Sequence, residues 1–222
     1  GRREVFIHLF QMGAGFVQHI GTALPGGGTT MPYGASELIE TFLYVLDGEG
    51  SLTVTVGDRT EVMPQGGYAY APAGVGISFR NETDKPLRFL LYKQRYIPHP
   101  DPEMRPYAVF GNTNDIEERI YDNMENVFVR DLLPVDERFD MNMHILSFAP
   151  GGCHPFVETH VQEHGAYLYE GEGVYLLNDD WIPVKAEDFI WMGAYCKQCC
   201  YGVGRTRLSY IYSKDCHRDA DI

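Results

Sequence analysis

Two segments of this chain match each other. ETFLYVLDGEG at residues 40–50 resembles EHGAYLYEGEG at residues 163–173. Each begins with Glu, continues as an apolar run that contains Tyr and Leu, and ends in a turn with two glycines. Runs of β-prone residues closed by glycine predict a strand followed by a turn. A matched pair at an offset of 123 residues therefore predicts two copies of one β unit.

A second match extends the repeat. Residues 67–93 match residues 188–214 at an offset of 121, and the two-residue slip falls where a hairpin loop can change length at little cost. Other short strands are predicted in residues 1–24 (one or two strands, broken by Gly13 and Gly15), 51–56 and 87–92, and again from Phe128 onward. Many short strands between glycines and prolines, with little helical periodicity, predict an all-β protein of sandwiches or barrels.

The stretch between the copies has a different character. It contains Pro98, Pro100, Pro102 and Pro106, and each proline fixes φ and removes a backbone donor. We predict an extended linker over residues 97–126, with one or two helical turns near residues 114–119. The predicted domains are then 1–96 and 127–222.

Composition narrows the function. Eighteen Lys and Arg residues against 31 Asp and Glu residues give 222 residues a net charge of −13. This charge argues against nucleic acids and anionic membranes as partners.

No apolar run approaches the ~20 residues of a membrane span, and no signal peptide begins the chain. Because Gly1 is not a natural start, we expect a cut or incomplete N-terminus, and a lost targeting segment remains open. Five cysteines, an odd number, favour a reducing compartment over a disulfide framework, so we expect a cytoplasmic protein.

The second copy carries a candidate metal site. Glu158, His160 and His164 all have even numbers, and alternate side chains of an extended chain share a face. Gln198 is the fourth candidate ligand. Oxygen and nitrogen ligands of this kind suit Mn²⁺, Fe²⁺ or Co²⁺ better than structural Zn²⁺. On an octahedral ion, four such ligands leave two open positions for substrate.

The first copy serves as an internal comparison. The offsets align the four candidate ligands with Ala35, Glu37, Thr41 and Ile77, which do not form a ligand set. We therefore predict that the first domain is metal-free and structural, and that the second is metal-binding and catalytic.

Structural explanations compete for several residues. His144 and His154 suit a supporting or purely structural role. Cys196, Cys199 and Cys200 include a C-x2-C pair, but no second pair exists to complete a zinc site. On composition alone Lys214 is an ordinary surface lysine, and Lys93 at the matching position of the first copy favours a structural role.

Two motifs carry a family resemblance. Residues 152–171, G-x5-E-x-H-x3-H-x6-G, resemble the first cupin motif with Glu and His exchanged, and residues 188–198, D-x4-G-x-Y-x2-Q, resemble the second with Gln in the His position. This combination is similar to that of the (S)-ureidoglycine aminohydrolase family, bicupins of allantoin degradation. The similarity covers both copies, although the chain starts later than that family's members. Its densest segments are residues 140–144, 158–165, 181–184 and 210–215.

The resemblance implies two jelly-roll barrels and a Mn²⁺-dependent hydrolase that converts (S)-ureidoglycine and water to (S)-ureidoglycolate and ammonia. It implies that Glu158, His160, His164 and Gln198 bind the metal, with other divalent metals possible. It also implies that Tyr175, Tyr210 and Lys214 contact the substrate. We expect Lys214 and Glu158 to handle the protons.

Other functions stay open at this point. Two histidines and one carboxylate are also the ligands of non-haem Fe(II) oxygenases, so a cupin oxygenase or isomerase is an alternative. A non-enzymatic storage or sugar-binding bicupin is a further one, but it has no need of four ligands in one copy only. Exposed strand edges and apolar faces favour a homo-oligomer of undetermined size.

Overall fold

The computed structural model describes residues 3–7, 13–215 and 217–218. Among these residues the regular elements are β-strands, apart from the single 3-10 turn η2 (Thr113–Asp115). The predicted helical turns near residues 114–119 shrink to this turn, and the chain continues into the short strand β10 (Arg119–Ile120). No helix in the described part of the chain is long and apolar enough to cross a membrane.

The chain forms two compact units. Unit 1 comprises Gly1–Asp115 and Asp136–Asp140, and unit 2 comprises Ile116–Val135 and Met141–Ile222. Both units therefore take part of the stretch that we predicted as a linker. Unit 1 also receives a short segment from beyond that stretch, because Phe139 is fully buried against the ring of Tyr70.

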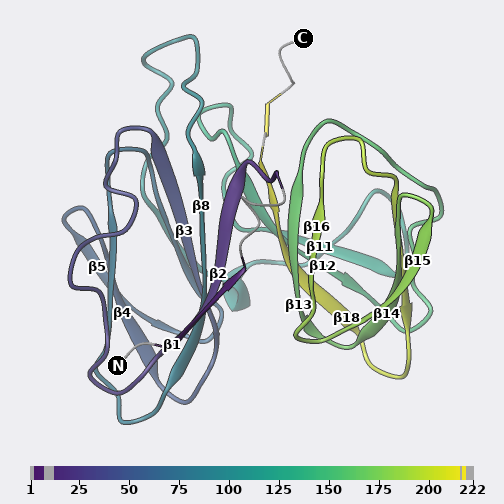
Figure 1. The fold of residues 1–222 in the computed structure, drawn as a ribbon, viewed down its shortest axis with the longest axis horizontal. Helices are drawn as coiled ribbons and strands as arrows, with labels where there is room; N and C mark the ends of the chain where they lie inside the picture. The colour runs from purple at the N-terminus through teal and green to yellow at the C-terminus, as the bar shows by residue number, and fades with distance from the viewer. Residues whose placement is uncertain (1–2, 8–12, 216, 219–222) are drawn as a thin grey trace. The chain divides into compact units, whose positions relative to one another are not determined.

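Unit 1 contains two antiparallel sheets (Figure 1). The strand order of the larger sheet is β1-β2-β8-β3-β6-β9, and that of the smaller is β5-β4-β7. The strands are β1 (Arg3–Ile7), β2 (Phe16–Ala23), β3 (Ile39–Asp47), β4 (Ser51–Val56), β5 (Arg59–Pro64), β6 (Gly67–Ala71), β7 (Ile77–Asn81), β8 (Leu87–Arg95) and β9 (Val109–Asn112). Our sequence analysis had not identified β5 and β7.

Unit 2 repeats this plan. Its larger sheet has the order β10-β11-β12-β18-β13-β16, and its smaller sheet has the order β15-β14-β17. The additional strands are β11 (Val127–Asp131), β12 (Asn142–Phe148), β13 (His164–Glu170), β14 (Glu172–Leu177), β15 (Asp180–Lys185), β16 (Phe189–Met192), β17 (Gln198–Val203) and β18 (Leu208–Lys214). Pro183 is tolerated in β15 because that strand lies at the edge of its sheet.

Strand register confirms the internal repeat. Leu43 pairs with Leu91 in unit 1, and Ala166 pairs with Tyr212 in unit 2, which reproduces the offsets of 123 and 121. Each unit has its own buried apolar cluster between its two sheets. The two units thus share one backbone plan, and they differ in the side chains that point into the interior at equivalent positions.

Candidate active site in unit 2

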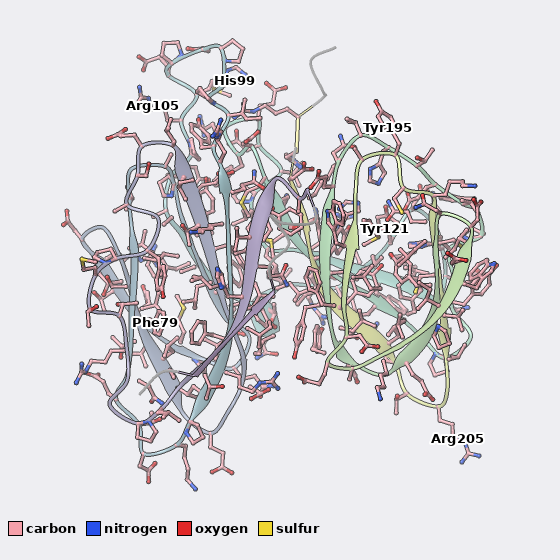
Figure 2. The ribbon with its side chains drawn as sticks, viewed as in Figure 1. Phe79, His99, Arg105, Tyr121, Tyr195 and Arg205 are labelled. Carbon is pink, nitrogen blue, oxygen red and sulfur yellow. The ribbon has the colours of Figure 1, made fainter. Side chains whose placement is uncertain are left out.

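Unit 2 contains a partly open cavity of about 510 Å³. Residues of both sheets and of the loop before β13 line it, together with Tyr121 (labelled in Figure 2), which follows β10. All seven predicted site residues are part of this lining: Glu158, His160, His164, Tyr175, Gln198, Tyr210 and Lys214. The fold therefore brings together side chains that are up to 56 positions apart in sequence.

Two histidines face each other across the cavity. Nε2 of His160 lies 3.1 Å from Nε2 of His164, and the rings meet nearly edge to face. The other ring nitrogens contact backbone carbonyls: Nδ1 of His164 lies 2.7 Å from the oxygen of Ser213, and Nδ1 of His160 lies 3.0 Å from that of Gln162. Because a carbonyl only accepts, each Nδ1 carries a proton, and in the neutral rings both Nε2 atoms are acceptors.

Burial keeps these rings neutral. It lowers the pKa of fully buried His164 to about 3, and the neighbouring His160 lowers it further. Burial likewise lowers the pKa of His160. Two lone pairs that face each other repel unless a proton or cation lies between them, so their convergence fits a cation site.

Gln198 completes this convergence. The nitrogen of its side-chain amide lies 2.7 Å from Nε2 of His160, and the residue is buried at the start of β17. The two ends of a side-chain amide are distinguished by their contacts alone, so either the nitrogen or the oxygen can be presented to the cavity. With the oxygen inward, the amide would present a neutral oxygen beside the two imidazoles.

Glu158 is positioned through its backbone. Its N–H donates to the carbonyl of Gln198 at 3.0 Å and its carbonyl accepts from Gln198 at 2.9 Å, which places the two residues side by side. Burial raises the pKa of the Glu158 carboxyl, Asp122 adds to this, and Lys214 opposes it. Within the described residues, no three His, Cys, Asp or Glu side chains are close enough together to hold a metal ion.

Lys214 and two tyrosines line the same cavity. Lys214 is half-buried at the end of β18, and Tyr210 lies four residues before it with its side chain on the same face. The hydroxyls of Tyr175 and Tyr210 lie 3.3 Å apart. Burial raises the pKa of both hydroxyls well above the usual value, so both stay protonated and can donate hydrogen bonds.

Unit 1 has apolar side chains where unit 2 has several of these site residues. The positions equivalent to Tyr175, Gln198, Tyr210 and Tyr212 hold apolar residues of the unit 1 core: Val54, Ile77, Phe89 and Leu91. One alignment from the sequence was wrong, because Tyr33, not Ala35, makes with Ile77 the same backbone pair that Glu158 makes with Gln198. A two-residue length difference in the loop that follows this position, before β3 or β13, hid this equivalence. Tyr33 packs against the core, so an aromatic ring stands where unit 2 has a carboxylate.

Three further polar residues belong to the same cavity. Asp131, His144 and His154 line the cavity, although the sequence offered no motif for Asp131. Only the pairing of β11 with β12 brings Asp131 beside His144. The four cysteines in the described residues are free thiols, and Cys200 belongs to the apolar core with Cys196 packed against it, which argues against a zinc site.

Comparisons with known proteins agree with this architecture. A cupin domain model matches residues 22–92. The chain is 47% identical to the (S)-ureidoglycine aminohydrolase of Escherichia coli (strain K12) over 96% of its own length and 80% of that protein. It is 30% identical to a probable (S)-ureidoglycine aminohydrolase of Oryza sativa subsp. japonica, of which it spans 64%. The crystal structure of YlbA from E. coli superposes with a TM-score of 0.86 at 43% identity, covering 100% of this chain and 85% of that one.

Two cupin barrels in one chain, one lined by polar side chains, make this protein a bicupin. The high identity to the E. coli relative over most of both chains then defines its place within that class. The chain belongs to the (S)-ureidoglycine aminohydrolase family.

Proposed function

We propose that this protein hydrolyses (S)-ureidoglycine to (S)-ureidoglycolate and ammonia at the cavity of unit 2. The observation that carries the proposal is the convergence of His160, His164 and Gln198 beside Lys214 in a chain of this family. In this reaction the C–N bond between the α-carbon and its amino group is broken, and a C–O bond to water is formed. The site must therefore bind a carboxylate, accept a proton from water and deliver a proton to the departing nitrogen.

We further propose that Glu158, His160, His164 and Gln198 hold a divalent metal, with Mn²⁺ as the best candidate. The facing imidazole acceptors support this, and oxygen and nitrogen ligands suit Mn²⁺. When bound, such an ion supplies Lewis acidity and orients the substrate.

The side chains have distinct tasks in this proposal. The Lys214 ammonium pairs with the substrate carboxylate as a compact charge and can deliver a proton to the leaving amine. Glu158 accepts a proton from the attacking water, which its raised pKa favours. Tyr175 and Tyr210 donate hydrogen bonds to the carbonyl oxygen of the ureido group, since both hydroxyls stay protonated.

Ammonia release from freshly generated (S)-ureidoglycine tests the proposal, together with metal analysis of the same preparation. We expect ammonia in proportion to enzyme, and a divalent metal in about one equivalent per chain. Absence of ammonia release from the metal-loaded protein would refute the proposed reaction.

A cupin oxygenase is the second candidate, since two histidines and a carboxylate also line an oxygenase iron site. Turnover under anaerobic conditions with ammonia as product excludes it. A requirement for dioxygen would establish it instead.

The proposal includes a cytoplasmic location and a homo-oligomer. The free thiols of Cys153, Cys196, Cys199 and Cys200 support a reducing compartment. The exposed rings of Trp181 and Tyr201, 5.5 Å apart, support a contact between copies, because paired exposed aromatic side chains favour protein interfaces. Light scattering measures the oligomer, and a monomer would refute that part.

A further inference from the structure

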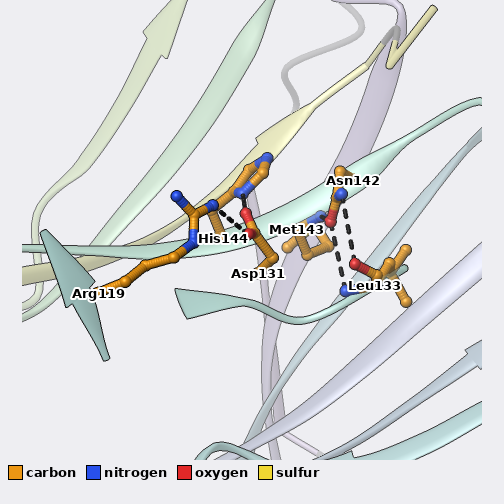
Figure 3. A network of polar contacts seen from close by, with 6 residues as sticks. All are labelled: Arg119, Asp131, Leu133, Asn142, Met143 and His144. Atoms are coloured by element: carbon orange, nitrogen blue, oxygen red, sulfur yellow. Dashed lines mark hydrogen bonds and ion pairs between the residues drawn. The ribbon is translucent and has the colours of Figure 1, made fainter. Parts of the chain in front are cut away.

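Three charged or polar side chains form a chain in the wall of the unit 2 cavity (Figure 3). Nδ1 of His144 lies 2.7 Å from Oδ1 of Asp131, and the guanidinium of Arg119 donates to Oδ2 of the same carboxylate. Asp131 and His144 are direct neighbours across the β11–β12 pair. All three line the cavity, and none of them belongs to the metal and substrate set described above.

The Asp131 carboxylate determines which nitrogen of His144 carries a proton. Burial raises the pKa of Asp131, but the hydrogen bonds from His144 and Arg119 outweigh it and bring the pKa down to about 2. Asp131 is therefore an anion at neutral pH and can only accept, so Nδ1 of His144 is the protonated nitrogen. In the neutral ring Nε2 is then an acceptor, and it has no hydrogen-bond partner among the described residues.

Aromatic packing holds the ring in place. His144 stacks on Tyr212 with ring centroids 5.0 Å apart and 26° between the planes. Tyr212 in turn meets His164 edge to face at 5.1 Å. The imidazole of His144 is thus one ring away from a proposed metal ligand and lines the same cavity.

Unit 1 provides a natural comparison. His19 in β2 occupies the position of His144 in β12, because Val17 pairs with Lys93 as Asn142 pairs with Lys214. The neighbour of His19 across β1 is Phe6, where His144 has Asp131. Both units carry the histidine, and the residue paired with it across the neighbouring strand is Phe6 in unit 1 and Asp131 in unit 2.

We propose that His144 is a substrate-binding residue whose Nε2 accepts a hydrogen bond from an N–H of the ureido group, with Asp131 and Arg119 as positioning residues. This inference rests on the proposed function. There Lys214 binds the substrate carboxylate, and the Tyr175 and Tyr210 hydroxyls donate to the ureido carbonyl. The ureido N–H groups still need an acceptor, and an imidazole whose Nδ1 proton is held by a carboxylate presents Nε2 for this purpose.

Two variants of His144 test the contact. Phe at this position keeps a ring to stack on Tyr212 but removes the acceptor, and Gln restores an acceptor oxygen. For His144→Phe we expect KM for (S)-ureidoglycine to rise about 10- to 100-fold, the effect of losing one hydrogen bond to a polar group. His144→Gln should recover part of this loss. Metal content and thermal unfolding should match the wild type in both, and His19→Phe should leave KM unchanged.

Asp131→Asn tests the positioning role without relying on turnover. The amide can donate to Nδ1, which favours the tautomer with its proton on Nε2. ¹⁵N NMR of histidine-labelled protein should show His144 protonated at Nδ1 in the wild type and at Nε2 in Asp131→Asn, with the signal assigned by its loss in His144→Phe. KM should rise in Asp131→Asn as it does in His144→Phe.

The outcomes separate the two proposals. A wild type that releases no ammonia refutes the proposed function and, with it, this inference. An active wild type together with an unchanged KM in His144→Phe overturns the inference alone. Protonation of His144 at Nε2 in the wild type also overturns it, because no acceptor would then face the cavity.

Discussion

Lys214 is a single side chain on which the proposed chemistry depends. It lies across from Asn142 in the β12–β18 pair, and it lines the cavity with His160 and His164. We predict that Lys214→Met lowers the rate of ammonia release at least about 100-fold, because the methionine keeps the apolar stem but removes the charge and the proton. Elemental analysis should show unchanged metal content. Loss of the metal along with the activity would make the lysine structural.

His154 predicts a pH effect on stability. Its ring is 3% exposed, neither ring nitrogen has a hydrogen-bond partner, and burial lowers its pKa from 6.5 to about 4. Between these two pH values the unfolded chain binds more protons than the folded one. The free energy of unfolding is therefore highest above pH 6.5, and it falls as the pH drops toward 4. The loss is on the order of 3 kcal/mol.

The variant His154→Leu removes this titration. Urea unfolding at a series of pH values should show a shallower decline between pH 6.5 and 4 than in the wild type. At pH 7.5 the variant should be at least as stable as the wild type, because an unpartnered buried polar group is lost. Parallel curves for the two proteins would contradict the assignment of this acid sensitivity to His154.

At the scale of elements, the turn between β13 and β14 depends on glycine. Gly171 has φ of 75°, and a Cβ there would overlap the carbonyl oxygen of Arg207. Gly151 has φ of 80°, but a Cβ there would meet nothing within 4 Å. We predict that Gly151→Ala lowers the free energy of unfolding by about 1 kcal/mol, from backbone strain alone. Gly171→Ala should lower it by about 3 kcal/mol or more, because the turn must also move. Urea unfolding of the matched pair measures the difference, and equal costs would contradict it.

The strands themselves were partly predictable. Alternating burial in β4 follows from its sequence SLTVTV, and the repeated Gly-Glu-Gly turns follow from the two copies of one motif. By contrast, β5 carries mostly exposed residues with little apolar alternation, so no periodic pattern identified it. The predicted helical turns near residues 114–119 shorten to η2 because pairing with β11 takes Arg119 and Ile120 into a sheet.

At the scale of the whole molecule, metal binding should stabilise the protein through unit 2. A ligand that binds only the folded state raises the free energy of unfolding by about 2.7 kcal/mol when its concentration is 100 times its Kd. We predict that adding Mn²⁺ to chelator-treated protein raises Tm, and that His164→Ala abolishes the shift. The control is Ile77→Val in unit 1, at the position equivalent to Gln198. This variant should have a lower Tm without metal but show the same rise in Tm when Mn²⁺ is added. A shift that persists in His164→Ala would place the metal elsewhere.

The duplicated strand pattern predicted an all-β protein with two copies of one unit, and residue spacing predicted Glu158, His160, His164 and Gln198 as ligands, because both are local features. The family resemblance added the bicupin fold and Tyr175, Tyr210 and Lys214, and all seven residues line the cavity. Tertiary structure decided the rest. It paired Tyr33 with Ile77, correcting the alignment of the copies, and it brought Asp131 beside His144. Both results depend on strand register, which pairing across a sheet sets and which spacing along one strand cannot show.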